Sequence, residues 1–250
     1  MTSVDAFILK VKRGKGPVYR TLRTVAKGIV QPRSRRIPGI LKLPLRLLYE
    51  FHFLVISLWR LLAGLLYRNP LFQSRCASVG KNLSIDGLPF VHGHVEVHIG
   101  DDVCLGGAVM IISGTLHDNP KVVIGNNSQL GWNVSISVCK EVIIEENVRI
   151  SFDCRIADGD GHPREADLRA AHKPPKLEDI RPVRICRNAW IGNGTHILKG
   201  VTIGEGAIVG ANSVVMSDVP PYSLAVGNPA RVYMKDFGLP STAAPSGSES

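Results

Sequence analysis

A repeat of six residues dominates this sequence and restricts the folds that the chain can adopt. The clearest series has an aliphatic residue at every sixth position: Ile185, Ile191, Ile197, Ile203, Val209 and Val215. Small or β-branched residues follow four positions after these: Ala189, Thr195, Val201, Ala207, Ser213 and Val219. The same period runs from Ile99 to Ile111, from Ile124 to Ile136 and from Ile144 to Ile156. An α-helix has a period of about 3.6 residues and a half-buried strand a period of about two, so neither explains the series.

A period of six residues instead indicates an all-β fold, the parallel β-helix, in which each repeat forms one side of a triangular coil. The aliphatic residue is expected to point into the prism, and the small residue to flank it. Glycine follows the aliphatic residue at Gly192, Gly204 and Gly210, where we expect it to allow the bend at a corner. A core of this kind uses Ile and Val, which agrees with 44% hydrophobic but only 6% aromatic residues. The alternative, an antiparallel sandwich with chance periodicity, would not sustain so long a series.

The repeats predict a β-helix over residues 76–235 with one long interruption, an excursion loop over residues 158–182. Loops of this length in a regular scaffold usually carry function. This loop contains His162, and a neutral imidazole can accept a proton from a hydroxyl or an amine near pH 7. The alternative is an exposed histidine without a role. The final segment, residues 236–250, is predicted to be disordered because it contains few apolar residues.

Positive charge is concentrated at the N-terminal end. The first 50 residues hold 12 of the 30 Lys and Arg residues but only two carboxylates, while the whole chain has a net charge of +9. We predict a basic, flexible arm over residues 1–43, which would suit acidic lipid headgroups, nucleic acid or plain solvent. Nucleic acid is not expected as a partner, because the rest of the chain shows neither a basic groove nor a set of stacking aromatics.

An amphipathic helix is predicted over residues 44–69. Pro44 suits the first turn of a helix, and Asn69-Pro70 is expected to end it. Polar or small residues form one narrow stripe along it: Lys42, Arg46, Glu50, Ser57, Arg60 and Gly64. Arg60 would cost about 2.5–3.5 kcal/mol at the centre of a bilayer, so we favour a helix that lies in the membrane interface. A true membrane span, and packing against the protein itself or against a trimer mate, are the alternatives.

The number and spacing of the cysteines indicate in which cellular compartment the protein resides. There are five of them, and none are spaced as in a Cys-x-x-Cys motif. Together with the absence of a recognisable signal peptide, this predicts reduced thiols in the cytoplasm. The basic arm and the apolar helix further predict a peripheral position on the inner face of the cytoplasmic membrane. Residues 1–69 would make the contact with the membrane. The histidines His92, His94, His98, His117 and His196 are interpreted as solvated, and no metal site is expected.

The last repeats resemble a known family. The segments that carry the resemblance are Ala189–Gly194, Lys199–Gly204, Gly210–Val215, Asp218–Ser223 and Gly227–Val232. They are similar to the hexapeptide-repeat acyltransferases, above all the galactoside/maltose-type O-acetyltransferases and the polysaccharide acetyltransferases, over residues 95–235. The resemblance implies a left-handed β-helix, a homotrimer, acetyl-CoA as co-substrate and no metal cofactor.

The resemblance also implies roles for individual residues. His162, in a His-Pro dipeptide, matches the family's catalytic general base. Four residues match positions beside the coenzyme, the first of them also close to the acceptor: Trp190, Asn193, Ala211 and Arg231. Asn133 is the candidate for binding the acceptor, with Gly131 as a second alignment. Asp160 or Glu165 is a candidate for orienting the imidazole, as is a backbone carbonyl.

The predicted function is the transfer of an acetyl group from acetyl-CoA directly to a saccharide hydroxyl, in surface polysaccharide or lipid-linked glycan synthesis. No covalent acyl-enzyme is needed, and none of the five cysteines adjoins His162 in the sequence. An amino-sugar N-acetyltransferase is the first alternative, because it would use the same base and coenzyme. A non-catalytic β-helix scaffold and a zinc lyase of the carbonic anhydrase kind are the others.

Overall fold

The computed structural model describes residues 11, 13, 14, 16–22 and 37–237 of the 250-residue chain. Most of the predicted basic arm and residues 238–250 of the predicted C-terminal tail lie outside the described residues. The chain divides into two compact units, Met1–Ser57 and Leu58–Ser250.

Three sheets of short strands build the second unit. The first, sheet A, contains β1 (Ser78–Val79), β4 (Glu96–Ile99), β7 (Lys121–Ile124), β10 (Glu141–Ile144), β13 (Val183–Ile185) and β16 (Thr202–Ile203). Sheet B contains β2 (Ser84–Ile85), β5 (Cys104–Leu105), β8 (Gln129–Leu130), β11 (Arg149–Ile150), β14 (Trp190–Ile191), β17 (Ile208–Val209), β19 (Leu224–Gly227) and β20 (Ala230–Met234). Sheet C contains β3 (Phe90–His92), β6 (Met110–Ser113), β9 (Ser135–Val138), β12 (Arg155–Ala157), β15 (His196–Ile197) and β18 (Val214–Val215).

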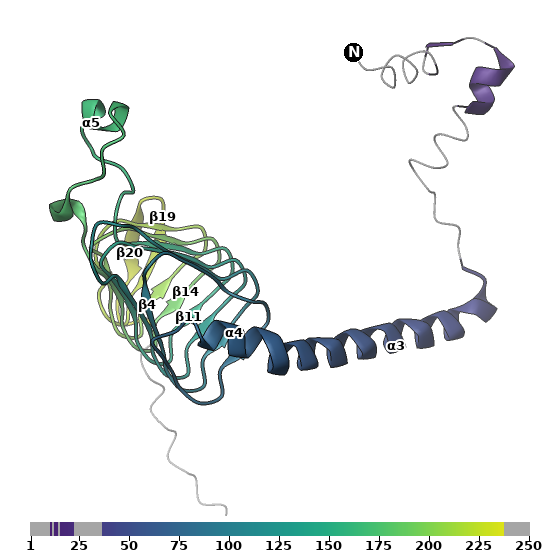
Figure 1. Cartoon of the computed structure of the whole chain (residues 1–250), viewed down its shortest axis with the longest axis horizontal. Coiled ribbons are helices and arrows are strands. Elements are labelled where there is room, and N and C mark those ends of the chain that lie inside the picture. Colours follow the sequence, from purple (N-terminus) through teal and green to yellow (C-terminus); the bar gives the residue numbers. More distant parts are fainter. Residues whose placement is uncertain (1–10, 12, 15, 23–36, 238–250) are drawn as a thin grey trace, which may run out of the picture. The chain divides into compact units, whose positions relative to one another are not determined.

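Successive strands therefore pass from sheet A to B to C and back to A, so that each group of three strands forms one coil (Figure 1). Strands of neighbouring coils pair in parallel, as β10 does with β7 and β13. The antiparallel pair β19–β20 closes the C-terminal end of sheet B. The parallel β-helix predicted from the six-residue period is confirmed.

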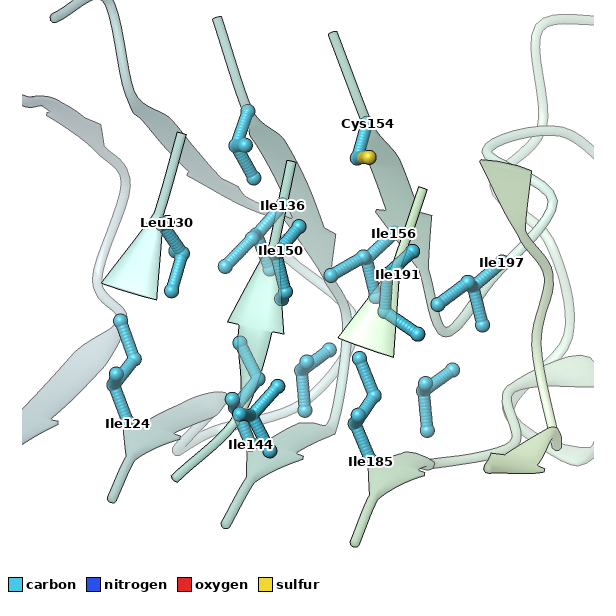
Figure 2. Packing of buried hydrophobic residues seen from close by; sticks show 14 of the residues in the cluster. Ile124, Leu130, Ile136, Ile144, Ile150, Cys154, Ile156, Ile185, Ile191 and Ile197 are labelled. Atoms are coloured by element: carbon cyan, nitrogen blue, oxygen red, sulfur yellow. The ribbon is translucent and has the colours of Figure 1, made fainter. Parts of the chain in front are cut away.

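The core is the interior of the prism, where the aliphatic residues of the repeat form one column for each sheet (Figure 2). Register places Ile124, Ile144 and Ile185 in the column of sheet A. The matching residues of sheets B and C, among them Ile150 and Ile156, are equally buried. Full burial of one such side chain stabilises the fold by about 1.5–3 kcal/mol, so the long aliphatic columns stabilise the β-helix with few aromatic residues.

The glycines that follow the aliphatic residues do not make the bends, and this part of the prediction is wrong. Gly192 and Gly204 are not among the residues with positive φ. A Cβ atom on them would lie 2.6 Å from the backbone nitrogen of Ala211 and 2.4 Å from that of Pro221, so glycine allows successive coils to approach. The positive φ angles occur three positions after each aliphatic residue, mostly at Asn and Asp, which tolerate this conformation: Asn127, Asn133, Asn147, Asp153, Asn188 and Asn212.

The predicted N-terminal helix is present but has different ends. α3 (Gly39–Ala63) continues through a π-helical turn, η1 (Gly64–Arg68), into α4 (Asn69–Gln73). The helix thus starts before Pro44 and does not stop at Asn69, because Pro70 occupies the first turn of α4, where a missing N–H leaves no bond unmade. No residue of α3 is buried. By length and composition alone, Gly39–Gln73 could cross a membrane, a criterion that core helices of soluble proteins also meet.

Candidate functional site

The excursion loop interrupts the β-helix between β12, which ends at Ala157, and β13, which begins at Val183. It leaves from the corner between sheets C and A and carries two short helices, α5 (Ala166–Ala170) and the 3₁₀ turn η2 (Leu177–Asp179). Figure 1 shows α5 projecting away from the coils. Most of the loop is exposed to solvent, so the coils hold it only at its base.

Asp158 closes that base. Its buried carboxylate accepts hydrogen bonds from the backbone N–H groups of Cys139, Lys140 and Glu141 at 2.6, 2.6 and 2.8 Å. Its carbonyl oxygen accepts a fourth from the backbone N–H of Arg181, at 2.9 Å. The start of the loop is thereby joined both to the preceding coil and to the end of the loop.

His162 combines an anchored backbone with an exposed side chain. Pro163 is buried, and the guanidinium of Arg169 donates to the carbonyl oxygens of Pro163 and Arg164 at 3.1 and 2.5 Å. Within the part of the chain that the structure describes, no hydrogen bond or ion pair engages the imidazole of His162. Both ring nitrogens are therefore free to meet a ligand from solvent, as a general base requires.

Neither carboxylate proposed to orient the imidazole contacts it. Asp160 accepts a hydrogen bond from the ammonium of Lys199, and its Oδ2 lies 3.5 Å from Nε of Arg164. Glu165 binds Lys176 through Oε1 at 2.5 Å, and this hydrogen bond lowers the pKa of Glu165 and raises that of Lys176. The other oxygen of Glu165, Oε2, is buried without a hydrogen-bond partner among the described residues and so has capacity for one more donor.

The four candidate coenzyme residues gather on sheet B and at the corner where it meets sheet C. Trp190 points outward from β14, with its side chain largely exposed and Nε1 3.4 Å from the hydroxyl of Ser151. Asn193 and Ala211 occupy equivalent places on successive coils, two positions after the aliphatic residues of β14 and β17. Arg231 lies opposite Val226 in the β19–β20 pair and uses Nη1 to bind the carbonyl of Ala230. These residues form one exposed strip that crosses several coils.

Asn133 is not brought to His162. It sits at the corner between sheets B and C with a φ of 59°, and its side-chain amide donates to Asp153 at 2.7 Å. His162 belongs to the corner between sheets C and A. Asn133 is thus a corner residue of one edge of the prism, and the predicted base lies on another.

Two features of the molecule, one on the strip of sheet B and one beside the loop, were missed in the sequence. Trp132 and Phe152 are half exposed and hold the same corner position on earlier coils that Asn193 and Ala211 hold on later ones. Phe152 and Asn193 line a hollow together with Gln129, Gly131, Arg149, Ile150 and Ser151. Counting two residues beyond each aliphatic of sheet B would have found this column. The second feature is Lys199, whose burial no sequence pattern indicated.

The described residues contain no group of side chains arranged to bind a metal ion. Across residues 37–237 and the few described before them, no three His, Cys, Asp or Glu side chains converge in an arrangement that could hold an ion. His94 instead uses Nε2 to contact the carbonyl of His117 at 2.8 Å. His98 lies beside Ser78 and Glu96.

Comparison with known proteins agrees with the repeat and the fold. The family model of the bacterial transferase hexapeptide, which spans six repeats, matches residues 182–216. A protein of Staphylococcus aureus strain COL that carries the name of an acetyltransferase is 38% identical over 147 residues, covering 51% of this chain and 68% of the relative. A Mycobacterium tuberculosis protein, also named as an acetyltransferase, is 30% identical over 184 residues, covering 71% of this chain and 56% of the relative.

A solved structure supports the fold. The S84A mutant of AntD, an N-acyltransferase from Bacillus cereus crystallised with a dTDP-amino sugar and coenzyme A, superposes with a TM-score of 0.53 at 22% identity. The alignment covers 66% of this chain and 86% of that one. With the repeats, the coils and the identity to named acetyltransferases taken together, the chain belongs to the acetyltransferases of the hexapeptide-repeat transferase family, whose scaffold is the left-handed parallel β-helix.

Proposed function

We propose that this protein is an acetyl-CoA-dependent O-acetyltransferase that acts on a saccharide hydroxyl, with His162 as its general base. One observation carries the proposal: the imidazole of His162 is exposed and unpartnered within the described chain, while Arg169 fixes the backbone on its C-terminal side. A group that must accept a proton from a bound substrate needs a fixed position and a free lone pair.

The reaction follows as a direct transfer. His162 removes the proton from the acceptor hydroxyl while the hydroxyl oxygen attacks the thioester carbonyl, and a backbone N–H stabilises the oxyanion. The carbon–sulfur bond then breaks, and the imidazolium returns the proton to the leaving thiolate of coenzyme A. Burial raises the pKa of all five cysteine thiols, which disfavours a cysteine nucleophile.

The exposed strip on sheet B fits an extended coenzyme. Trp190 offers an apolar ring face, and Arg231 lies on β20, three strands away across the sheet, about 14 Å at the usual strand spacing of about 4.8 Å. Among the described residues the guanidinium of Arg231 hydrogen-bonds through Nη1 alone, so its other N–H groups are available for phosphate. Because this strip and His162 lie on different edges of one prism, a homotrimer would complete the site by joining the edges of two subunits.

Membrane contact accounts for the N-terminal extension. The exposed apolar surface of α3 and the basic residues before it suit the inner face of a cytoplasmic membrane with anionic lipids. An acceptor attached to a lipid would be presented at that surface. Lipid-linked or surface polysaccharide glycans are therefore the favoured acceptors.

Thiol release from acetyl-CoA tests the proposal. Wild-type protein, His162→Ala and a control, His172→Asn, are assayed with membrane glycolipid extracts and with soluble sugars and amino sugars. His172 lies in the same loop with a φ of 53°, which Asn tolerates, so the control changes a second loop histidine without strain.

We expect acceptor-dependent thiol release to fall by about 10²- to 10⁴-fold in His162→Ala, with an unchanged melting temperature, and to persist in His172→Asn. If only the amino sugars are acetylated, the acceptor in this mechanism is an amine and not a hydroxyl. Equal rates for His162→Ala and wild type would remove His162 as the base, and a failure of acetyl-CoA to bind would favour the scaffold alternative.

A further inference from the structure

The excursion loop has an outgoing limb, which carries Asp160, and a returning limb, which carries Asp179. Both limbs contact one buried cation, Lys199. It follows β15 at the corner between sheets C and A. Since Ile156 pairs with Ile197, Lys199 occupies on the next coil the place that Asp158 has at the base of the loop. Its side chain is only 7% exposed, which is unusual for a lysine.

The ammonium of Lys199 holds one carboxylate from each limb. It donates to Oδ2 of Asp160, two residues before His162 on the outgoing limb. On the returning limb, Oδ1 of Asp179 lies 4.0 Å from Nζ. Arg164 reaches the same two carboxylates from the surface, with Nε 3.3 Å from Asp179, and completes a network of two cations and two anions.

This network ties both limbs of the loop to the coils beyond the base that Asp158 closes. A buried ammonium without partners is strongly disfavoured because it loses its hydration, so the folded chain favours the arrangement in which Asp160 and Asp179 meet it. Apolar contacts contribute little, because Pro163 and Ile180 are the two apolar residues of segment 158–182 that are buried. Together with Asp158 at the base of the loop and Arg169 beside Pro163, the contact between Lys199 and Asp160 therefore constrains the backbone that carries His162.

We infer that Lys199 is a positioning residue for catalysis: it fixes the two limbs of the loop and thereby the imidazole of His162. The inference rests on the proposed role of His162. A positioning role predicts a loss of rate without a loss of stability, whereas a structural ion pair predicts a loss of stability. A displacement of about 1 Å of a reacting group can reduce a rate by up to about 10²-fold while the fold remains intact.

Four variants separate a positioning role from a structural one in steady-state kinetics. Lys199→Met keeps the length and apolar stem of the side chain but removes the charge, and Lys199→Arg restores it. Lys176→Met is the matched control, because it breaks an ion pair of the same loop that is exposed and does not reach the coils. Asp160→Asn weakens the same network by removing the charge of the partner carboxylate. It replaces Lys199→Met if that variant does not fold, because the Asp160 side chain is 40% exposed and the substitution should be tolerated.

We expect kcat to fall by about 10- to 100-fold in Lys199→Met and Asp160→Asn, while KM for acetyl-CoA stays within about twofold. Lys199→Arg is expected to recover most of kcat, and Lys176→Met to retain the wild-type value. A kcat of Lys199→Met equal to that of wild type would overturn the inference. So would equal loss in Lys199→Arg and Lys199→Met with a lowered melting temperature, which is the pattern of a structural role.

Limited trypsin digestion tests the same inference without any acceptor. The bonds after Arg169 and Lys176 lie in the loop, and their cleavage reports how often it opens. In Lys199→Met we expect cleavage there to be about tenfold faster than in wild type, with no change in Lys176→Arg, which keeps the trypsin site. If wild type transfers no acetyl group but this difference appears, the proposed reaction fails and the anchoring of the loop stands. If cleavage rates are equal, the inference fails whatever the activity.

Discussion

At the scale of single residues, the corner positions show how one repeat meets two different demands. Where glycine follows the aliphatic residue, as at Gly192 and Gly204, the backbone of the next coil lies too close for a Cβ atom, and the residue three positions after the aliphatic adopts a positive φ. Asn and Asp meet the second demand and also bond to each other along the coils, as Asn127 does with Asn147 at 2.8 Å. The glycines directly after the aliphatic residues therefore allow the coils to pack closely, whereas Gly194, Gly200 and Gly206 supply the positive φ of the corner.

Replacing one of these glycines tests this assignment. In Gly192→Ala the new Cβ would meet backbone atoms of the next coil, which cannot rotate away as a flexible side chain would. We expect a loss of about 1–3 kcal/mol in the free energy of unfolding, measured by urea denaturation. Gly39→Ala is the control, because nothing lies within 4 Å of a Cβ there. Equal stability of Gly192→Ala and wild type would mean that the coils can separate at no cost.

At the scale of elements, α4 does more than end the N-terminal helix. Phe72 is 1% exposed and belongs to the same buried cluster as the columns of the β-helix, with Val79 and Val91 of the first coil packed against that cluster. α4 thus contributes an aromatic side chain to the core beside the first coil. A parallel β-helix exposes its core at either end unless another element covers it.

Truncation of this side chain should therefore be costly. We expect Phe72→Ala to lower the free energy of unfolding by about 3–5 kcal/mol, as for other large side chains removed from a core. Leu71→Ala, in the same turn of α4, should have a small effect because Leu71 is 44% exposed. Thermal and urea unfolding of the two variants provide the comparison. Similar losses for both would show that α4 is held by its surface and not by Phe72.

At the scale of the whole molecule, α3 is the element whose surroundings the β-helix does not explain. Its large apolar side chains are exposed almost all round, and its charged residues, Lys42, Arg46, Glu50 and Arg60, share one stripe. An apolar helix surface of this extent is stable when an apolar phase covers it. In a trimer, three such helices would bind a membrane with the combined strength of three weak anchors.

Vesicle binding tests this placement with a charge-matched pair of variants. By helical geometry Val55 lies opposite the polar stripe, whereas Ser57 lies within it. Because Val55→Glu puts a carboxylate on the apolar side, we expect about tenfold weaker sedimentation with vesicles containing anionic lipid. Ser57→Glu adds the same charge and should change binding little. Equal effects of the two variants would assign any membrane binding to electrostatic attraction alone.

The six-residue period determined the fold from sequence alone, because the buried columns require the same residue type at the same point of every coil. The interruption of the period in turn located the excursion loop and His162 within it. Single-residue roles followed less well: the bend at each corner was assigned to Gly204 and its equivalents, whereas the positive φ angles lie three positions after the aliphatic residue, at Asn, Asp or, as at Gly206, a different glycine.

Only the tertiary structure decided what surrounds the candidate base. Asp160 and Glu165 are near His162 in the sequence, yet each is drawn to a lysine, at residues 199 and 176, because an opposite charge outweighs proximity along the chain. Lys199 is 39 residues from Asp160, and no periodicity connects them. A repeat determines how coils stack, but contacts between an irregular loop and the coils depend on where the chain returns in space.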